Sequence, residues 1–133
     1  MILCDTDILI EFYKNNPKVV NDLRHIGQSR LAISVITQAE LYFGALNKTE
    51  LRKIRRHHAS IYCFPLDLAT SDKFIYLMEM YCLSHKLHIP DALIAATALI
   101  HNLELYTLNS KDFQFIPGIQ MYKPIDFDGV THE

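Results

Sequence analysis

Short apolar runs alternate with longer helix-like segments along the 133 residues of this chain. The runs that suit strands are residues 1–4, 31–34, 61–64, 104–107 and 119–122. Apolar spacing, together with proline, glycine and capping residues, predicts helices over residues 8–13, 17–26, 35–46, 48–58, 67–86 and 91–102. Strands that alternate with helices indicate a parallel sheet covered on both faces. We therefore predict an α/β fold, a three-layer α/β/α domain around a central, mainly parallel sheet of four to five short strands.

The length of the chain limits it to one domain. A chain of this size buries roughly two thirds of its unfolded surface in a single core, so we treat residues 1–133 as one domain with a loosely ordered C-terminal tail over about 124–133. No stretch approaches the roughly 18 uninterrupted apolar residues of a membrane span, and the N-terminus lacks the features of a signal peptide. We expect a cytoplasmic protein that has no membrane contact.

The basic residues are unevenly distributed. The net charge is −2, but residues 48–58 contain five basic side chains and one acidic, which leaves eight basic and fourteen acidic residues elsewhere. The helix over this segment either presents a solvated face or contacts the phosphates of a nucleic acid such as RNA. Arg52 and Arg56 are the candidates for such contacts.

Three carboxylates stand where a charge needs an explanation. Asp5 follows the first predicted strand directly, at the end of a buried run where an unpaired charge is costly. Glu40 lies on the apolar face of its helix, and Asp91 stands in the first turn of the most apolar helix in the chain. Glu40 has ordinary alternatives as a solvated acid at the rim of that face or as the partner of a basic residue, and Asp91 has one as a helix cap. Asp7 is predicted to be the N-cap of the helix that follows it.

Taken together, the three acids favour a metal site. In parallel α/β sheets ligands bind beyond the carboxyl ends of the strands, and a strand end, a helix face and a helix N-terminus can converge there. Two carboxylates about 5 Å apart repel each other by about 3 kcal/mol at an effective dielectric of roughly 20, and a divalent cation removes this penalty. Oxygen ligands without cysteine or histidine suit Mg²⁺ or Mn²⁺. An ion held by Asp5, Glu40 and Asp91 predicts phosphodiester hydrolysis by metal-activated water.

Four segments resemble, in order, the motifs of a known family. ILCDTDILI, SVITQAELYFGA, IPDALIAATAL and LYTLNSKDF look like the motifs of VapC-type PIN-domain toxins, and the resemblance extends from residue 1 to about 122. By this resemblance Asp5, Glu40 and Asp91 correspond to the catalytic, metal-binding acids, and Thr6 to a small hydroxyl residue that supports the metal site. It implies Mg²⁺- or Mn²⁺-dependent endoribonuclease activity, a PIN-like fold and homodimerisation. It also implies inhibition by a small cognate antitoxin, the partner protein of a type II toxin–antitoxin system.

The chain departs from the family pattern at two places. Asp7 stands where many members have asparagine or serine, which adds negative charge near the expected ion. The usual fourth acidic position falls on Asn109, with Asp112 three residues later, so these two compete for the fourth catalytic position. Thr107 is expected to support the site through its hydroxyl group.

Two other functions remain open from the sequence. Asp5 and Asp7 after a strand imitate the paired aspartates of a haloacid-dehalogenase-like phosphatase, although Ile8 and Leu9 follow where that family has glycine and threonine. In such a phosphatase Asp7→Asn would abolish activity, whereas the nuclease would tolerate it. The alternative of a different class is a catalytically silent PIN-like module that binds RNA or protein, which the presence of three acids disfavours. The chain carries no glycine-rich nucleotide loop of the GxGxxG or GxxxxGK[ST] type.

Overall fold

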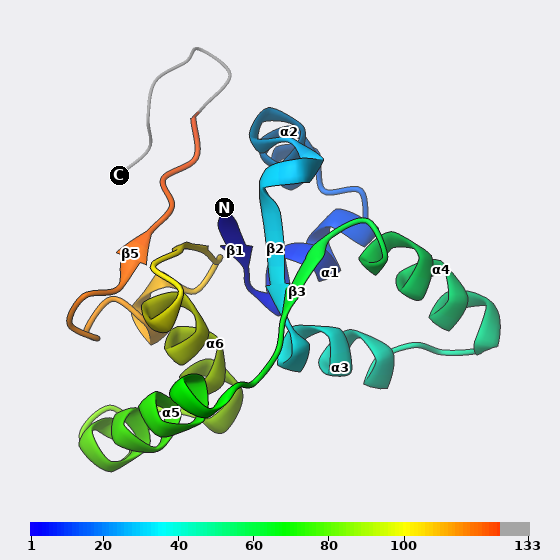
Figure 1. The fold of residues 1–133 in the computed structure, drawn as a ribbon. Coiled ribbons are helices and arrows are strands. Elements are labelled where there is room, and N and C mark those ends of the chain that lie inside the picture. Colours follow the sequence, from blue (N-terminus) through cyan, green and yellow to red (C-terminus); the bar gives the residue numbers. More distant parts are fainter. Residues whose placement is uncertain (126–133) are drawn as a thin grey trace.

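Five parallel strands form one sheet in the order β3-β2-β1-β4-β5 (Figure 1). The structure is a computed structural model that describes residues 1–125. The strands are β1 (Ile2–Cys4), β2 (Leu31–Ser34), β3 (Tyr62–Phe64), β4 (Glu104–Tyr106) and β5 (Gln120–Met121). They lie within the five predicted runs. The inner strands β1 and β2 are buried along their whole length, as their continuous apolar runs require, whereas the edge strands β3 and β5 are partly exposed. The predicted parallel sheet of four to five short strands is confirmed.

Helices cover both faces of the sheet and complete the three layers. The first face carries α1 (Thr6–Tyr13), α2 (Pro17–Ile26), α3 (Val35–Phe43) and α4 (Lys48–His58), and the second carries α5 (Leu68–Tyr81) and α6 (Ile89–Ile100). Successive strand residues face opposite layers. In β2, Leu31 and Ile33 pack with the first group and Ala32 packs with the second. Figure 1 shows α5 and α6 together on one side of the sheet and α4 on the other.

Three helices end earlier than the sequence predicted, α6 by two residues and α3 and α5 by more. α3 ends at Phe43, with Gly44 as its C-cap, and α5 ends at Tyr81 although its pattern predicted a helix to residue 86. Beyond α5 the amides of His85 and Leu87 both donate to the carbonyl of Tyr81, and Lys86 adopts a φ of 52°. This left-handed turn ends the helix. The apolar spacing of the sequence continues past Tyr81, so it predicted a helix that is too long.

Most of the predicted C-terminal tail, beyond residue 125, lies outside the described residues. Among the helices of the described part, none combines the length and the apolar composition needed to cross a bilayer.

The order of the strands determines where a site can form. From central β1 the chain moves outward through β2 to β3, and then crosses by α5 and α6 to β4 on the other side of β1. The strand order therefore reverses between β1 and β4. In open parallel sheets ligands bind beyond the carboxyl ends of the strands at such a reversal. Asp5 and Thr107, which directly follow β1 and β4, lie at this point.

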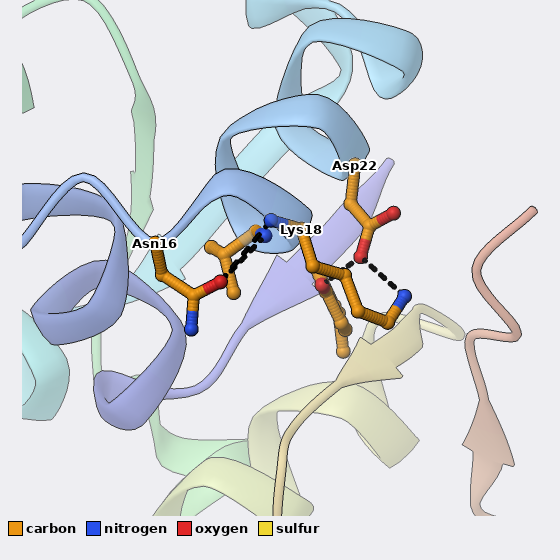
Figure 2. A network of polar contacts seen from close by, with 5 residues as sticks. Asn16, Lys18 and Asp22 are labelled. Carbon is orange, nitrogen blue, oxygen red and sulfur yellow. Dashed lines mark hydrogen bonds and ion pairs between the residues drawn. The ribbon is translucent and has the colours of Figure 1, made fainter. Parts of the chain in front are cut away.

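A buried carboxylate that the sequence did not reveal fastens α2 to β4. Asp22 is 2% exposed; it accepts a hydrogen bond from the Tyr106 hydroxyl and pairs with the Lys18 ammonium at 3.3 Å. Figure 2 shows this pairing beside Asn16, whose side chain caps the start of α2. A buried carboxylate is tolerated only when it is hydrogen-bonded or paired. Because the Tyr106 carbonyl also accepts from the amide of Asp5 at 2.9 Å, this network anchors the strand end that carries the site.

Candidate active site

Asp5 stands at the junction of β1 and α1 and is 6% exposed. One carboxylate oxygen accepts from the amide of Thr6 at 2.8 Å, and the other accepts from the hydroxyl of Thr107 at 2.7 Å. Asp5 is therefore the N-cap of α1. The prediction that Asp7 caps this helix is wrong, because α1 already begins at Thr6 and only Asp5 lies between it and the end of β1. Asp5 is held in place by the first residue of α1 and by the residue that follows β4.

Asp7, in the first turn of α1, holds the loop that follows β4. Its Oδ2 accepts from the amide of Leu108 at 3.1 Å and from the side-chain amide of Asn109 at 2.8 Å. The amide of Asn109 also donates to the Thr107 hydroxyl at 3.0 Å. The other oxygen of Asp7 is buried and has no hydrogen-bond partner within the described residues. The carboxylate thus anchors the loop and leaves one oxygen free to bind a ligand.

Glu40 reaches the same edge of the sheet from α3. Its Oε1 accepts from the hydroxyl of Thr6 at 2.7 Å, and this hydroxyl lies 3.1 Å from that of Thr37. Thr37 is fully buried one helical turn before Glu40. Sequence reasoning missed Thr37, since the only signal was a small polar residue on a helix face. The two threonines fix the orientation of the Glu40 carboxylate.

Asp91 and Asp112 approach from the other side. Asp91 lies in the first turn of α6 and Asp112 in the 3-10 turn Ser110–Asp112, and both line a pocket of about 100 Å³. Burial, followed by the charges of Asp5, Asp112 and Glu40, raises the pKa of Asp91 to about 6 against the lowering effect of the charge of His88. The structure therefore brings Asp91 within electrostatic range of all three carboxylates.

No acid of this site forms an ion pair with a basic residue in the described part of the chain. Burial and the charge of Asp7 raise the pKa of Asp5 to about 6, outweighing the hydrogen bonds from Thr107 and Thr6. Burial also raises the pKa of Asp7. In the part of the chain that the structure describes, the ion pairs are Lys14–Glu11, Lys18–Asp22 and His101–Asp67, so none includes an acid of the site. A cation is the group that this arrangement lacks.

The residues present fit Mg²⁺ or Mn²⁺ better than a metal that needs a closed protein cage. Among residues 1–125, no three acidic, histidine or cysteine side chains are grouped closely enough to enclose an ion by themselves. Mg²⁺ is usually bound by one or two carboxylates, with water and substrate phosphate as its other ligands. The mutually repelling carboxylates and the unpartnered oxygen of Asp7 supply such a partial, oxygen-only set. A closed zinc site would require four protein ligands.

Other predicted residues lie at different distances from this site. Thr107 and Asn109 belong to the loop that Asp7 holds. Arg52 and Arg56 are exposed on α4, on the side opposite its buried residue Ile54. The structure does not bring these arginines to the carboxylates.

Comparison with known proteins places this arrangement in a family. The PIN domain model matches residues 2–117. Ribonuclease VapC10 of Mycobacterium tuberculosis is 35% identical over 129 residues, covering 93% of this chain and 92% of that protein. A toxin-antitoxin complex from Klebsiella pneumoniae contains a chain with a TM-score of 0.77 and 33% identity, covering 90% of this chain and 95% of that one. A chain in the structure of VapBC-1 from nontypeable Haemophilus influenzae has a TM-score of 0.74 and 29% identity, covering 92% of this chain and 97% of that one. The chain belongs to the PIN-domain family, and within it to the VapC group.

Proposed function

We propose that the chain is a Mg²⁺- or Mn²⁺-dependent endoribonuclease that acts as the toxin of a toxin–antitoxin pair. The observation that carries this proposal is the group of acids without basic partners, Asp5, Glu40 and Asp91, at the reversal of strand order between β1 and β4. The substrate class is supported by the mycobacterial relative, which is named a ribonuclease. The chemistry is hydrolysis of an RNA phosphodiester bond.

In this proposal the acids of the chain hold the ion and orient the scissile phosphate beside it. Asp5 and Asp91 contribute carboxylate oxygens, and Glu40 contributes directly or through water. When bound, the ion acts as a Lewis acid that lowers the pKa of water and offsets the charge growing on the phosphate. Thr107 and Thr6 keep Asp5 and Glu40 in position through hydrogen bonds of 2.7 Å each. The water oxygen bonds to phosphorus, the bond from phosphorus to a ribose oxygen breaks, and that oxygen takes up a proton.

We place Asp112, not Asn109, in the fourth catalytic position. The charge of Asp112 raises the pKa of Asp91, and both line the same pocket. The side-chain NH₂ group of Asn109 is committed to Asp7 at 2.8 Å. Asn109 therefore serves in this proposal to hold the loop after β4, and its side-chain carbonyl oxygen remains available as an acceptor.

The antitoxin is proposed to cover a groove beside Glu40. This groove, of about 600 Å³, lies between α1, α3 and α4 and is lined by apolar side chains that include Ile10, Leu41 and Leu46. Leu46 is 85% exposed, and nearby Phe43 is 93% exposed. Exposed apolar groups of this size mark protein contacts, and the solved relatives are toxin-antitoxin complexes. Co-expression with the adjacent upstream reading frame tests this point, with co-purification and loss of ribonuclease activity as the expected result.

A second apolar surface supports a homodimer. The outer side of α5 and the turn after it expose Leu68, Ile75, Tyr76, Met80 and Leu83, with Leu83 92% exposed. Exposed apolar side chains of this kind, here with the acids Asp72 and Glu79 among them, can pack against their own copy in a twofold dimer. Sedimentation equilibrium of the purified chain is expected to give twice the mass of 15.4 kDa. A monomer at all concentrations would contradict the dimer.

No observation favours the alternative functions. Asp7, which would be the acid/base of a phosphatase, uses one of its two carboxylate oxygens to hold Leu108 and Asn109, which is the role of a loop anchor. A silent binding module gives no reason for several unpaired carboxylates at one sheet edge, because each raises the pKa of its neighbours at a cost in stability.

Metal dependence provides the first test of the enzyme. Metal-depleted protein is expected to leave single-stranded and structured RNA intact, to cleave it internally after Mg²⁺ or Mn²⁺ is added, and to stop when EDTA is in excess. Gel analysis of end-labelled RNA measures this. Intact RNA at high protein concentration, with both metals and many substrates, would falsify the proposal.

A further inference from the structure

The pocket beside Asp91 and Asp112 contains positive charge as well as acid. Three segments that are far apart in the chain form its wall: the turn after α5, the start of α6, and the 3-10 turn with the residues that follow it. We use the name lysine pocket for the part of this wall formed by His85, Lys86, His88, Lys111 and Phe115.

The two lysines are available to an anionic ligand. Lys86 and Lys111 are exposed, and neither forms an ion pair with any residue that the structure describes, although acids lie nearby. A substrate that carries phosphates is repelled by the carboxylates of the site. Cations at the rim of such a site offset this repulsion and attract the substrate.

The backbone of Lys86 shows that its position is fixed. Its φ is 52°, in the left-handed region, and the turn is closed by the amides of His85 and Leu87 on the carbonyl of Tyr81 at 3.1 and 3.3 Å. Glycine adopts this conformation without steric cost, so the backbone alone does not favour a lysine.

An aromatic pair stands at the mouth of the same pocket. The rings of His85 and Phe115 are stacked, with centroids 4.1 Å apart and an interplanar angle of 11°. Tyr81 meets both rings edge-on at 5.6 and 5.3 Å. The ring of exposed His85 is therefore held in place by packing. Bases of single-stranded RNA stack on rings of this kind.

We propose that the lysine pocket binds the RNA strand next to the bond that is cut. Lys86 and Lys111 contact a phosphate, and the ring of His85 stacks with the adjacent base. The volume of about 100 Å³ corresponds to about three water molecules of about 30 Å³ each, so the pocket admits a phosphate group while the base stays at its rim. This assignment rests on the proposed ribonuclease function and gives it a substrate-binding subsite.

The test compares two pairs of charge-removing substitutions. The double variant Lys86→Ala and Lys111→Ala removes both lysine charges from the pocket. The control double variant, Arg24→Ala and Arg30→Ala, removes two exposed cations near the amino end of β2, at the opposite edge of the sheet. Binding of labelled single-stranded RNA is measured in EDTA by fluorescence anisotropy at several salt concentrations. The lysine variant is expected to bind RNA about tenfold more weakly than the wild type. Its plot of log binding constant against log salt concentration should be less steep by about 0.7, because one phosphate contact is lost. The arginine variant is expected to match the wild type.

Two further variants separate charge from stacking. Lys86→Arg with Lys111→Arg keeps the charges and is expected to retain binding. His85→Ala is expected to weaken binding about fivefold or more, the loss of one stacked base, with no change in salt slope. In cleavage with Mn²⁺, the Lys86→Ala and Lys111→Ala pair is expected to raise KM about tenfold and to leave kcat within about twofold.

The outcomes distinguish this inference from the function on which it rests. Wild-type protein that neither binds nor cleaves RNA overturns both. Wild-type protein that cleaves RNA, with a Lys86→Ala and Lys111→Ala variant that matches the arginine control, overturns the lysine pocket alone. Tighter Mn²⁺ binding in this variant with unchanged RNA binding also overturns it, since the lysines would then only offset the acids. Equal thermal unfolding of all variants excludes a folding defect.

Discussion

Asp5→Asn is expected to lower the rate of RNA cleavage about a thousandfold or more. The substitution removes a charge that binds the ion, and a loss of about 4 kcal/mol of transition-state stabilisation corresponds to about a thousandfold in rate. Asparagine keeps the shape of the side chain and is an equally good N-cap, so it can still accept from the amide of Thr6, now 2.8 Å away. The fold is therefore retained while the charge is lost. Single-turnover cleavage with Mn²⁺ measures the effect.

Asp7→Asn is the matched control, in the same turn of α1 and with the same change of charge. An amide oxygen can still accept from Leu108 and Asn109, whose donors lie 3.1 and 2.8 Å from Asp7. The rate is expected to fall by no more than about tenfold, the lower end of the effect of groups that orient metal ligands. Loss of activity in Asp7→Asn equal to that in Asp5→Asn would instead favour paired-aspartate phosphatase chemistry.

Asp91→Asn is expected to abolish most activity and yet to stabilise the metal-free protein. The pKa of Asp91 is raised from 3.8 to about 6 in the folded state, first by burial and then by the charge of Asp5. A shift of this size is worth about 3 kcal/mol for a fully buried charge; because Asp91 is half-buried, solvent screening reduces it to about 1 kcal/mol. In EDTA at pH 7, urea unfolding is expected to show a gain of about this size in the free energy of unfolding.

The pH dependence of this gain has a definite sign. A folded-state pKa above the unfolded value means that protonation stabilises the fold, so the stability from the neutral carboxyl is lost as pH rises through about 6. The advantage of Asp91→Asn should therefore disappear between pH 7 and about 4. His58 acts in the opposite direction, because burial lowers its pKa to about 4, so its contribution is lost as pH falls below about 6.5. Subtracting the two proteins at each pH removes the effect of His58.

Mn²⁺ is expected to make the wild type more stable than Asp91→Asn, the reverse of the order in EDTA. With Mn²⁺ at about 100 times its Kd, the wild type gains about 2.7 kcal/mol from binding, whereas Asp91→Asn gains little. Cleavage by the variant is expected to fall about a hundredfold or more. A variant that is less stable than the wild type in EDTA, or that Mn²⁺ stabilises equally, would show that Asp91 is a structural cap.

The layers of the fold could be predicted because local patterns determine them. Each strand is a short apolar run, and Pro17, Gly27 and Ser34 stand at helix boundaries that the structure retains. The helix end beyond Tyr81 could not be read in the same way. It depends on the backbone of Lys86 and on two hydrogen bonds to one carbonyl, while the apolar spacing continues past it.

The acids of the site were found because each occupies the end or face of an element, but their partners come from distant segments. The hydrogen bonds between Asp7 and the loop after β4 join residues that lie 101 and 102 positions apart in the sequence. Lys86 and Lys111 meet only in the folded chain, so no run of charge marks them. The contiguous basic segment drew attention instead to Arg52 and Arg56, which lie exposed on α4 and whose contact with RNA stays a prediction.

The central claim is that the carboxylates after β1 and at the start of α6 hold a divalent cation. A crystal of the protein in Mn²⁺, examined by anomalous scattering at the manganese edge, tests it most directly. The expected result is an anomalous peak coordinated by Asp5 and Asp91, with Asp112 rather than Asn109 beside it. Mn²⁺-dependent cleavage of RNA in solution together with no peak between Asp5 and Asp91 would contradict this assignment of the site.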